Sequence, residues 1–200
     1  MKIGLFGGSF DPIHRGHIEP VREARRLLGL DRVVYLPTAT PPHKPRRALA
    51  PAHARYAMVE LALLVEAGLY ASAHELTPDR PAYTIETLEH FRREMPDAEL
   101  HLLIGGDSFA DFHHWVRWRE IAAAARLVVL ARPGWDLESF PLDPGVAALA
   151  RTDRVLLLRQ PPVDVSSTRL RELLATGQPL PPGAIPGLVV RYVQKYDLYR

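Results

Sequence analysis

The chain has no cysteine, which excludes a disulfide framework and a thiolate metal site. Lysine is also scarce, since Lys2, Lys44 and Lys195 are the only lysines, so arginine carries most of the positive charge. The formal net charge is +2, and no long run of like charges is present. Nothing in this balance points to a nucleic-acid partner, and we expect none.

Long apolar segments are missing too. The segment 122–131 is interrupted by Arg126 and is too short to span a bilayer. No cationic start with an apolar stretch and a cleavage site precedes the first predicted strand. We therefore expect a cytoplasmic protein that does not act at a membrane.

Two common nucleotide-binding signatures are absent as well. Gly4, Gly7 and Gly8 do not form the Gly-x-Gly-x-x-Gly fingerprint of dehydrogenases, and the lysine-containing phosphate loop of kinase-type enzymes does not occur. These absences argue against both classes of enzyme.

What is present favours one well-packed domain over residues 1–200, since 47% of the residues are hydrophobic. Short apolar runs alternate with amphipathic segments, which is typical of a parallel sheet covered on both faces. We expect an α/β fold, namely a doubly wound Rossmann-like parallel sheet with helices on both faces and a C-terminal helical segment. The predicted strands are 2–6, 32–36, 69–73, 99–104, 127–131 and 154–158, and the predicted helices are 17–28, 52–66, 85–95, 118–124, 168–175 and 188–195.

The most informative segment is Gly7–His17, which reads Gly-Gly-Ser-Phe-Asp-Pro-Ile-His-Arg-Gly-His directly after the first predicted strand. Glycines after a strand let the backbone approach an anion, and two histidines at a helix start can donate hydrogen bonds to phosphate oxygens. The positive end of the helix dipole acts at the same point. The segment therefore predicts a triphosphate site. The alternative is that the glycines only form a tight turn and the histidines only begin a helix.

A second segment, Val165–Arg171, reads Val-Ser-Ser-Thr-Arg-Leu-Arg at the start of an amphipathic pattern. Serine and threonine hydroxyls at a helix start either cap the helix or contact phosphate, and taken alone this segment is more typical of a plain cap. Together, the two segments resemble the nucleotidylyltransferase superfamily, whose His-x-Gly-His signature is present here as His14 to His17.

Further segments refine this resemblance. They are Pro41-Pro42-His43-Lys44, Pro81-Ala82-Tyr83-Thr84-Ile85-Glu86-Thr87, Gly106-Asp107-Ser108 with Trp115, and Arg132-Pro133-Gly134. Trp115 follows Asp107 by eight residues, and Arg-Pro-Gly closes the fifth predicted strand. With these segments the chain resembles bacterial nicotinate-mononucleotide adenylyltransferases over almost its whole length. The resemblance implies transfer of the adenylyl group of ATP to nicotinate mononucleotide, giving nicotinate adenine dinucleotide and pyrophosphate in NAD biosynthesis.

Alternatives stay open at this point. Another adenylyltransferase or cytidylyltransferase of the superfamily, such as phosphopantetheine adenylyltransferase, would share the first motif but not Tyr83, Thr84 and Trp115. A regulatory module would bind ATP without transferring it, and would not need His17, Arg171 and a second-substrate loop together. The amide form of the mononucleotide also stays an alternative to the acid form.

The resemblance implies roles for residues of both phosphate motifs. His17 should contact the α-phosphate, His14 should lie toward the β-phosphate, and Arg171 should hold the leaving pyrophosphate, so these three are the predicted catalytic residues. The predicted ATP-binding residues are Gly7, Gly8, Ser9, Phe10, Ser166 and Thr168.

A second set of residues should bind nicotinate mononucleotide. Trp115, with Trp118 as second choice, should stack on the pyridinium ring, because an aromatic face attracts a cation. Both tryptophans could instead be core residues. Backbone amides around Tyr83 and Thr84 should bind the ring carboxylate. The full predicted set is His43, Lys44, Tyr83, Thr84, Asp107 and Trp115.

Ordinary structural roles are alternatives for several of these residues. Lys44 could be a solvated loop charge rather than a phosphate ligand. Thr84 and Asp107 could be helix caps, although Asp107 could also bind ribose hydroxyls or lie near the metal. His113 and His114 receive no role.

Magnesium is the expected cofactor. No compact set of carboxylates is visible in the sequence, so we expect the ion to be held mainly by the phosphates of ATP. The expected partners are therefore ATP and nicotinate mononucleotide, and a homo-oligomer is left open.

Overall fold

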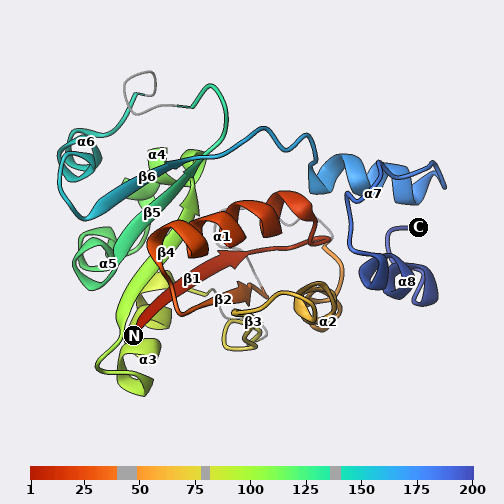
Figure 1. The fold of residues 1–200 in the computed structure, drawn as a ribbon, viewed down its shortest axis with the longest axis horizontal. Coiled ribbons are helices and arrows are strands. Elements are labelled where there is room, and N and C mark those ends of the chain that lie inside the picture. The colour runs from red at the N-terminus through yellow and green to blue at the C-terminus, as the bar shows by residue number, and fades with distance from the viewer. Residues whose placement is uncertain (40–48, 78–81, 136–140) are drawn as a thin grey trace. The chain divides into compact units, whose positions relative to one another are not determined.

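The computed structural model describes residues 1–39, 49–77, 82–135 and 141–200. Figure 1 shows the arrangement of its helices and strands. The strands are β1 (Lys2–Gly8), β2 (Arg32–Pro37), β3 (Leu69–Ala71), β4 (Glu99–Gly105), β5 (Arg126–Ala131) and β6 (Val155–Arg159). The helices are α1 (Arg15–Leu28), α2 (Ala52–Leu63), α3 (Thr84–Glu94), α4 (Gly106–Ala110), the 3-10 helix η1 (Phe112–His114), α5 (Trp118–Ala124), α6 (Pro144–Ala150), α7 (Ser167–Ala175) and α8 (Gly187–Lys195).

The strands form one parallel sheet in the order β3-β2-β1-β4-β5-β6 (Figure 1). In the register, Ile3 of β1 is opposite Leu100 of β4, and Val128 of β5 is opposite Leu156 of β6. Most of these strands are apolar runs rather than alternating patterns, because a parallel sheet is covered on both faces. The order of the strands reverses between β1 and β4, as in doubly wound sheets that bind nucleotides.

The predicted α/β fold is confirmed, and each predicted strand and helix has a counterpart at nearly the same residues. One predicted helix was too long, since α2 ends at Leu63 instead of Glu66. The chain there enters a turn in which the Glu66 amide donates to the Leu63 carbonyl and Gly68 has a φ of 76°. A side chain would be strained in that conformation, so glycine is favoured after the helix.

Three short helices, α4, η1 and α6, were not predicted. For α6, the signal is the cap at its start: one carboxylate oxygen of Asp143 accepts hydrogen bonds from the amides of Gly145 (2.8 Å) and Val146 (3.4 Å). Pro144 occupies the first helical position, where its missing amide hydrogen costs nothing. Short helices of this kind show little periodicity, which explains why the pattern did not reveal them.

The described chain divides into two compact units, which we treat separately. The first unit comprises Met1–Phe6, Ala24–Val33 and Tyr83–Pro162, and the second comprises Gly7–Glu23, Val34–Ala82 and Val163–Arg200. The single domain over residues 1–200 stays a prediction.

In the first unit, the core contains side chains of β1, β4 and β5. Gly4 of β1 shows how closely this core is packed, because a Cβ atom there would lie 2.9 Å from Val33 and 3.1 Å from both Leu30 and Leu103. A glycine at this position therefore allows three apolar side chains to pack against the strand.

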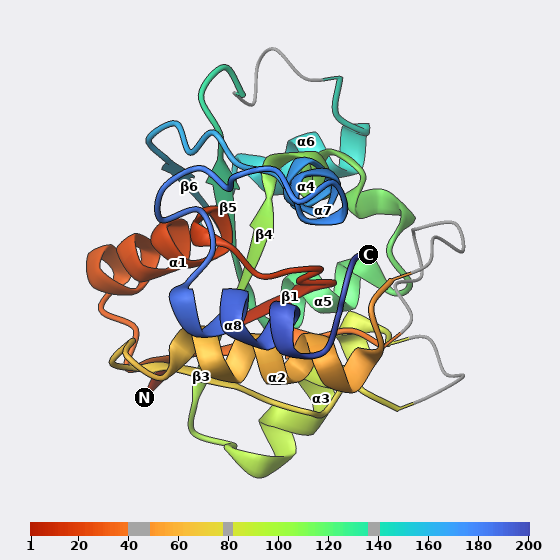
Figure 2. The ribbon, with the colours of Figure 1, turned by 90° about the vertical axis from the view of Figure 1, so that its right-hand side faces the viewer.

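In the second unit, α8 lies along α2, as Figure 2 shows. Val189 and Val193 of α8 are buried, and so are Met58 and Val59 of α2. This spacing of apolar residues is that of amphipathic helices that bury one face. Pro186 immediately precedes α8, where proline fits the start of a helix.

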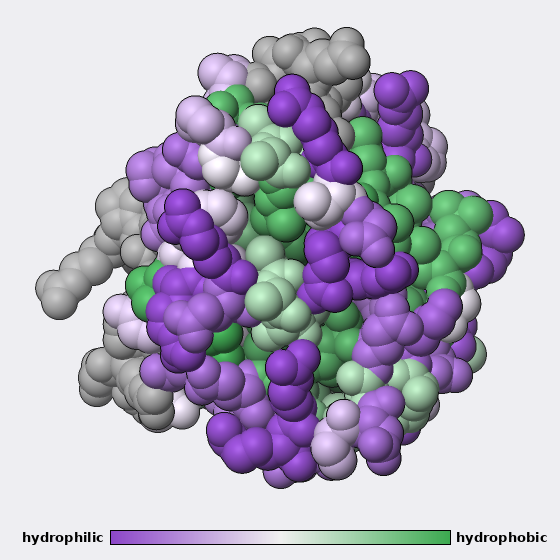
Figure 3. Space-filling model, turned by 90° about the vertical axis from the view of Figure 1, so that its left-hand side faces the viewer, coloured by the Kyte–Doolittle hydropathy of each residue, from purple (hydrophilic) through white to green (hydrophobic). Residues whose placement is uncertain are grey.

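The surface carries polar and apolar residues together. The face drawn in Figure 3 is mainly hydrophilic, with hydrophobic residues exposed between the hydrophilic ones. In the part of the chain that the structure describes, no helix is both long and apolar enough to cross a membrane.

His101 of β4 generates a prediction for the pH dependence of stability. Its side chain is buried in the first unit, with Nδ1 3.3 Å from the Glu99 carbonyl oxygen. Burial lowers the pKa of His101 below the usual value, against an opposing effect of Glu99. The unfolded chain therefore binds a proton that the folded chain does not, and the free energy of unfolding should fall as the pH drops below about 6.5.

Urea unfolding of the wild type and of His101→Gln between about pH 7.5 and about pH 5 measures this effect. The variant should lose less stability on acidification than the wild type. His53→Gln, on the exposed surface of α2, is the matched control and should follow the wild-type curve. Parallel curves for all three proteins would contradict the prediction.

Candidate active site

The two histidines of the first motif lie together at the start of α1 in the second unit. His14 directly precedes the helix and His17 lies in its first turn, with their ring centroids 3.8 Å apart. Gly16 makes this possible, because a Cβ atom there would lie 2.9 Å from Cε1 of His14. The glycine between the histidines is therefore required by the packing of the His14 ring.

The orientation of His17 is set by its neighbours. The backbone amide of His14 donates to Nδ1 of His17 at 3.3 Å, so the neutral ring carries its proton on Nε2. The Tyr35 hydroxyl donates to the His17 carbonyl at 3.0 Å, and Phe10 packs edge-on against the ring with centroids 5.2 Å apart. Burial raises the pKa of Tyr35 well above its usual value, so it stays a donor. The ring is thus held as a hydrogen-bond donor through Nε2.

The glycine pair before this motif leaves the backbone accessible. Gly7 is exposed, whereas Phe10 is buried in a left-handed conformation with a φ of 46°. A Cβ atom on Gly8 would lie 2.9 Å from the Phe10 ring, so a larger residue there would displace the phenylalanine. Because a bulky residue rarely adopts positive φ, the Phe10 conformation indicates a loop that its surroundings hold in place.

Arg55 of α2 is one of those surroundings. Its buried guanidinium donates to the carbonyl of Ser9 at 2.7 Å and of Thr38 at 2.8 Å. It also donates to the carbonyls of Ala50 and Ala39, at 2.9 and 3.1 Å. Burial lowers the pKa of Arg55, although it stays far above neutral for a guanidinium. One side chain therefore holds the loops that follow β1 and β2.

The second motif begins α7 and contacts the first motif within the same unit. Ser166 caps the helix, since its hydroxyl accepts from the Arg169 amide at 3.3 Å. The Ser167 hydroxyl donates to the Pro12 carbonyl at 3.2 Å. Ser166 therefore caps the helix, and its contact with phosphate stays a prediction.

Arg171 of α7 makes the main contact between the two motifs. Its Nη1 donates to the Asp11 carbonyl at 2.5 Å and lies 3.5 Å from Oδ2 of Asp11. Its Nη2 donates to the Thr168 hydroxyl at 3.3 Å. Two segments 160 residues apart in sequence are therefore joined at the predicted triphosphate site.

The predicted mononucleotide residues that are described lie in the first unit. Tyr83 is the N-cap of α3 and Thr84 is its first helical residue, so Thr84 does not cap the helix. The first amides of a helix have no partner within it, which makes this start a source of hydrogen-bond donors. The position is compatible with a carboxylate ligand, and the role stays a prediction.

Asp107 and Trp115 follow β4 in the same unit. Asp107 is exposed in the first turn of α4, and Trp115 is half-buried at the end of η1, with its ring centroid 5.4 Å from that of Phe112. Trp118, the second choice, has its ring against Phe112 at 5.9 Å and under the Arg119 guanidinium at 4.4 Å. Both tryptophans therefore pack on Phe112, and the choice of Trp115 for the pyridinium ring stays a prediction.

Gly106 and Trp135 fix the segment between β4 and α4. A Cβ atom on Gly106 would lie 2.5 Å from the buried Trp135 ring. The ring of Phe109 packs edge-on against Trp135 at 6.4 Å and stacks on Phe112 at 6.3 Å. This aromatic cluster packs beneath the surface segments that carry Asp107 and Trp115 and holds them in place.

His43 and Lys44 lie outside the described residues, so their binding roles stay predictions. His113 and His114 lie in η1 with ring centroids 3.8 Å apart. Within the described ranges, no group of three histidine or carboxylate side chains could hold a metal ion.

Sequence reasoning missed the residues that hold the site together. Asp11 stood in the quoted motif but received no role. Arg55 and Tyr199 carry no local signal, because each acts on a segment far away in sequence. The Tyr199 hydroxyl donates to Oδ1 of Asp11 at 2.7 Å, 188 residues along the chain.

Comparison with known proteins gives a consistent result. The family model described as cytidylyltransferase-like matches residues 5–173. A protein of Aeromonas hydrophila named "Probable nicotinate-nucleotide adenylyltransferase" is 41% identical over 99% of this chain and 97% of its own length. A protein of the same name from Thermus thermophilus is 40% identical over the whole of both chains.

The solved structures include the nicotinic acid mononucleotide adenylyltransferase of Plasmodium falciparum complexed with NaAD. It has a TM-score of 0.76 and 18% sequence identity, and the match covers 99% of this chain and 97% of that chain. At this identity the likeness shows a shared fold.

Arg55 generates a prediction for stability. Arg55→Lys should lower the free energy of unfolding by about 3 kcal/mol, because one ammonium group cannot serve four carbonyls and the buried ones lose their donor. Equilibrium urea unfolding measures the change. Arg22→Lys is the matched control, since Arg22 makes a surface pair with Glu66, and it should cost at most about 1 kcal/mol. Equal losses in the two variants would contradict the structural role of Arg55.

Proposed function

Because the chain belongs to the cytidylyltransferase-like family, we propose that it transfers the adenylyl group of ATP to nicotinate mononucleotide. A phosphate oxygen of the mononucleotide attacks the α-phosphorus of ATP, and the bond between that phosphorus and the bridging oxygen of the β-phosphate breaks. The products are nicotinate adenine dinucleotide and pyrophosphate. The observation that carries the proposal is the junction of the His-x-Gly-His segment with Arg171 through Asp11. Relatives about 40% identical over the whole chain carry the name of this activity.

The phosphate side of the proposed reaction is electrostatic. A phosphate monoester is already anionic at neutral pH, so the transfer needs no general base and no covalent intermediate. We assign His17 to the α-phosphate, His14 to the β-phosphate region and Arg171 to the leaving pyrophosphate. The donor Nε2 of His17 and the guanidinium of Arg171 would stabilise charge that moves toward the leaving group. The same anion would be bound by backbone groups of Gly7, Gly8, Ser9 and Phe10. The hydroxyls of Ser166 and Thr168 would bind it as well.

The mononucleotide side uses other chemistry. The ring carboxylate would accept from amides at the start of α3, near Tyr83 and Thr84. Trp115 would stack on the pyridinium cation, and Asp107 would accept from ribose hydroxyls. His43 and Lys44 would bind the phosphate as donors. We propose the acid form of the mononucleotide as the preferred acceptor, because amide donors match a carboxylate.

The described side chains do not fit a magnesium ion held by the protein. Asp11 is buried and already accepts hydrogen bonds from Tyr199 and Ala50. Among the described residues, Asp107 does not belong to any group of three or more side chains that could hold a metal ion. We therefore propose that magnesium enters on the phosphates of ATP, where it neutralises part of their charge. A cytoplasmic location and the absence of nucleic-acid and membrane partners are also proposals.

His17→Ala tests the phosphate side. Pyrophosphate release that depends on nicotinate mononucleotide should show a kcat about 100-fold lower, with a KM for ATP within about threefold of the wild type. The reason is that Nε2 acts where charge develops, and ground-state binding depends on the other donors. His53→Ala, exposed on α2, should behave as the wild type. Equal losses in kcat and ATP affinity would contradict the role of His17.

Trp115→Ala tests the mononucleotide side. The KM for nicotinate mononucleotide should rise about tenfold and the KM for ATP should stay unchanged, because the ring is lost from one substrate only. Trp118→Ala is the comparison, since it removes a tryptophan that packs on Phe112 and Arg119 and should lower stability without this selective change. An unchanged KM in Trp115→Ala would place that ring in the core.

A further inference from the structure

The Asp11 carboxylate has no role in the proposed reaction, yet it is buried and makes several contacts. Asp11 is almost fully buried, with 1% of the residue exposed. Its Oδ1 accepts from the Tyr199 hydroxyl at 2.7 Å and from the Ala50 amide at 3.2 Å. Its Oδ2 has no hydrogen-bond donor among the described residues, and Nη1 of Arg171 lies 3.5 Å from it. The two oxygens of one carboxylate are therefore in very different environments.

This asymmetry determines how Arg171 pairs. A guanidinium and a carboxylate prefer a bidentate pair with two parallel hydrogen bonds. Here the donors of Tyr199 and Ala50 occupy Oδ1, and Nη1 of Arg171 donates to the Asp11 carbonyl at 2.5 Å and lies 3.5 Å from Oδ2. Its Nη2 is directed instead to the Thr168 hydroxyl at 3.3 Å, in the second phosphate motif. Part of the guanidinium is thus kept out of the ion pair.

The C-terminal segment has a backbone that brings Tyr199 to this position. Asp197 and Tyr199 both have positive φ, 50° and 70°, although neither is glycine. The Leu198 amide donates to the Val193 carbonyl at 3.1 Å, which turns the chain back on α8. Positive φ costs free energy in such residues and persists only where other contacts fix it. The bond from Tyr199 to Asp11 is one such contact.

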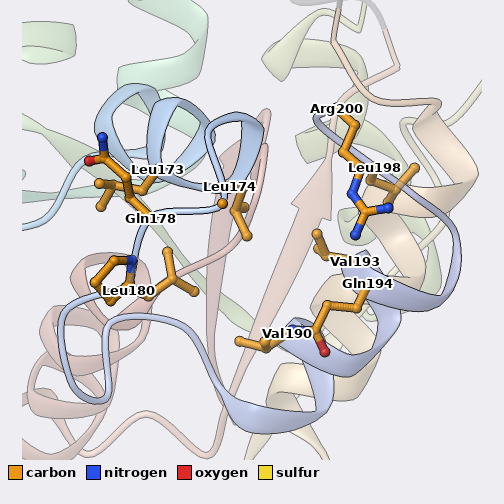
Figure 4. A pocket seen from close by; sticks show the side chains of 11 residues that line it. Leu173, Leu174, Gln178, Leu180, Val190, Val193, Gln194, Leu198 and Arg200 are labelled. Carbon is orange, nitrogen blue, oxygen red and sulfur yellow. The ribbon is translucent and has the colours of Figure 1, made fainter.

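The C-terminal segment also borders a cavity, where its side chains have few packing partners. A cavity of about 280 Å³ lies between α7 and α8 in the second unit, and Leu198 and Arg200 line it. Figure 4 shows Leu173 and Leu174 of α7 on one side of it and side chains of α8 on the other. Atoms that face a cavity lack packing partners there. The position of the segment therefore depends strongly on its polar contacts.

The Tyr199 hydroxyl is suited to act as a permanent donor. Burial raises the pKa of Tyr199, and the negative charge of Asp11 raises it further. The phenol therefore stays protonated at every pH at which the protein would work.

We propose that Tyr199 is a positioning residue that, by donating to Asp11, prevents a bidentate Asp11–Arg171 pair and keeps the Arg171 guanidinium directed at the leaving pyrophosphate. This inference rests on the proposed function for the role of Arg171. Without the hydroxyl, Oδ1 loses its shorter hydrogen bond and keeps the Ala50 amide at 3.2 Å, and Arg171 turns to serve both oxygens. The guanidinium is then withdrawn from the phosphate.

Tyr199→Phe tests this inference, because it removes the hydroxyl and keeps the ring. The inhibition constant of pyrophosphate and the KM for ATP should both rise about tenfold, with the KM for nicotinate mononucleotide unchanged. Tyr196→Phe is the matched control, since Tyr196 lies in the same segment, is exposed and packs at a tilt against Tyr192, with ring centroids 4.7 Å apart. Wild-type constants in Tyr199→Phe, or equal changes for both substrates, would overturn the inference.

A double-mutant cycle separates positioning from general stability. In an Arg171→Ala background, Tyr199→Phe should cause no further change in pyrophosphate affinity, because the group that it positions is gone. A full further loss would show that Tyr199 acts on the fold rather than through Arg171, and would overturn the inference.

Pyrophosphate affinity also distinguishes this inference from the proposed function. Calorimetric titration with pyrophosphate needs no mononucleotide. A wild type that binds pyrophosphate but does not use nicotinate mononucleotide would refute the proposed acceptor, and weaker binding in Tyr199→Phe would still support the positioning role. A wild type that does not bind pyrophosphate would overturn the inference.

Discussion

The buried carboxylate of Asp11 is the interaction on which the second unit depends. A charge removed from water must be compensated by donors or by an opposite charge. Two donors, the Ala50 amide and the Tyr199 hydroxyl, and the opposite charge of the Arg171 guanidinium compensate it here. They belong to the segment before α2, to the chain after α8 and to α7. One carboxylate therefore holds three segments that are distant in sequence against the loop that follows β1.

Arg55 performs a complementary task with the opposite charge. Its guanidinium is buried among carbonyls, including those of Ser9 and Thr38, rather than among carboxylates. The loops after β1 and β2 are thus held through their backbone, and Gly7 at the end of β1 is exposed. The two buried charges explain why a loop with Phe10 at positive φ is stable.

The two units contribute different chemistry to the proposed reaction. The second unit carries imidazoles, a guanidinium and a helix start, all of which suit an anion. The first unit carries an aromatic cluster, in which Phe112 and Trp135 support the ends of α4 and η1. Trp115, half-buried against Phe112 of this cluster, suits a flat cationic ring. This division matches two substrates, one rich in phosphate and one with a pyridinium ring.

Much of the fold could be predicted from the sequence, because apolar runs such as β4 and β5 have the length and composition of buried parallel strands. The phosphate motifs could be predicted because their residues are local. Short elements such as α6 could not, since a single turn or two has no measurable period. Tyr199 and Arg55 could not either, because a contact between residues 188 or 46 positions apart leaves no pattern in one sequence.

The measurement that tests the account most directly is pyrophosphate release with ATP and magnesium, comparing nicotinate mononucleotide, nicotinamide mononucleotide and phosphopantetheine as acceptors at equal concentrations. We expect release to be much faster with nicotinate mononucleotide than with the other two. Release with phosphopantetheine alone would keep the phosphate chemistry of His14, His17 and Arg171 but contradict the proposed acceptor, and no release with any of the three would contradict the proposed activity.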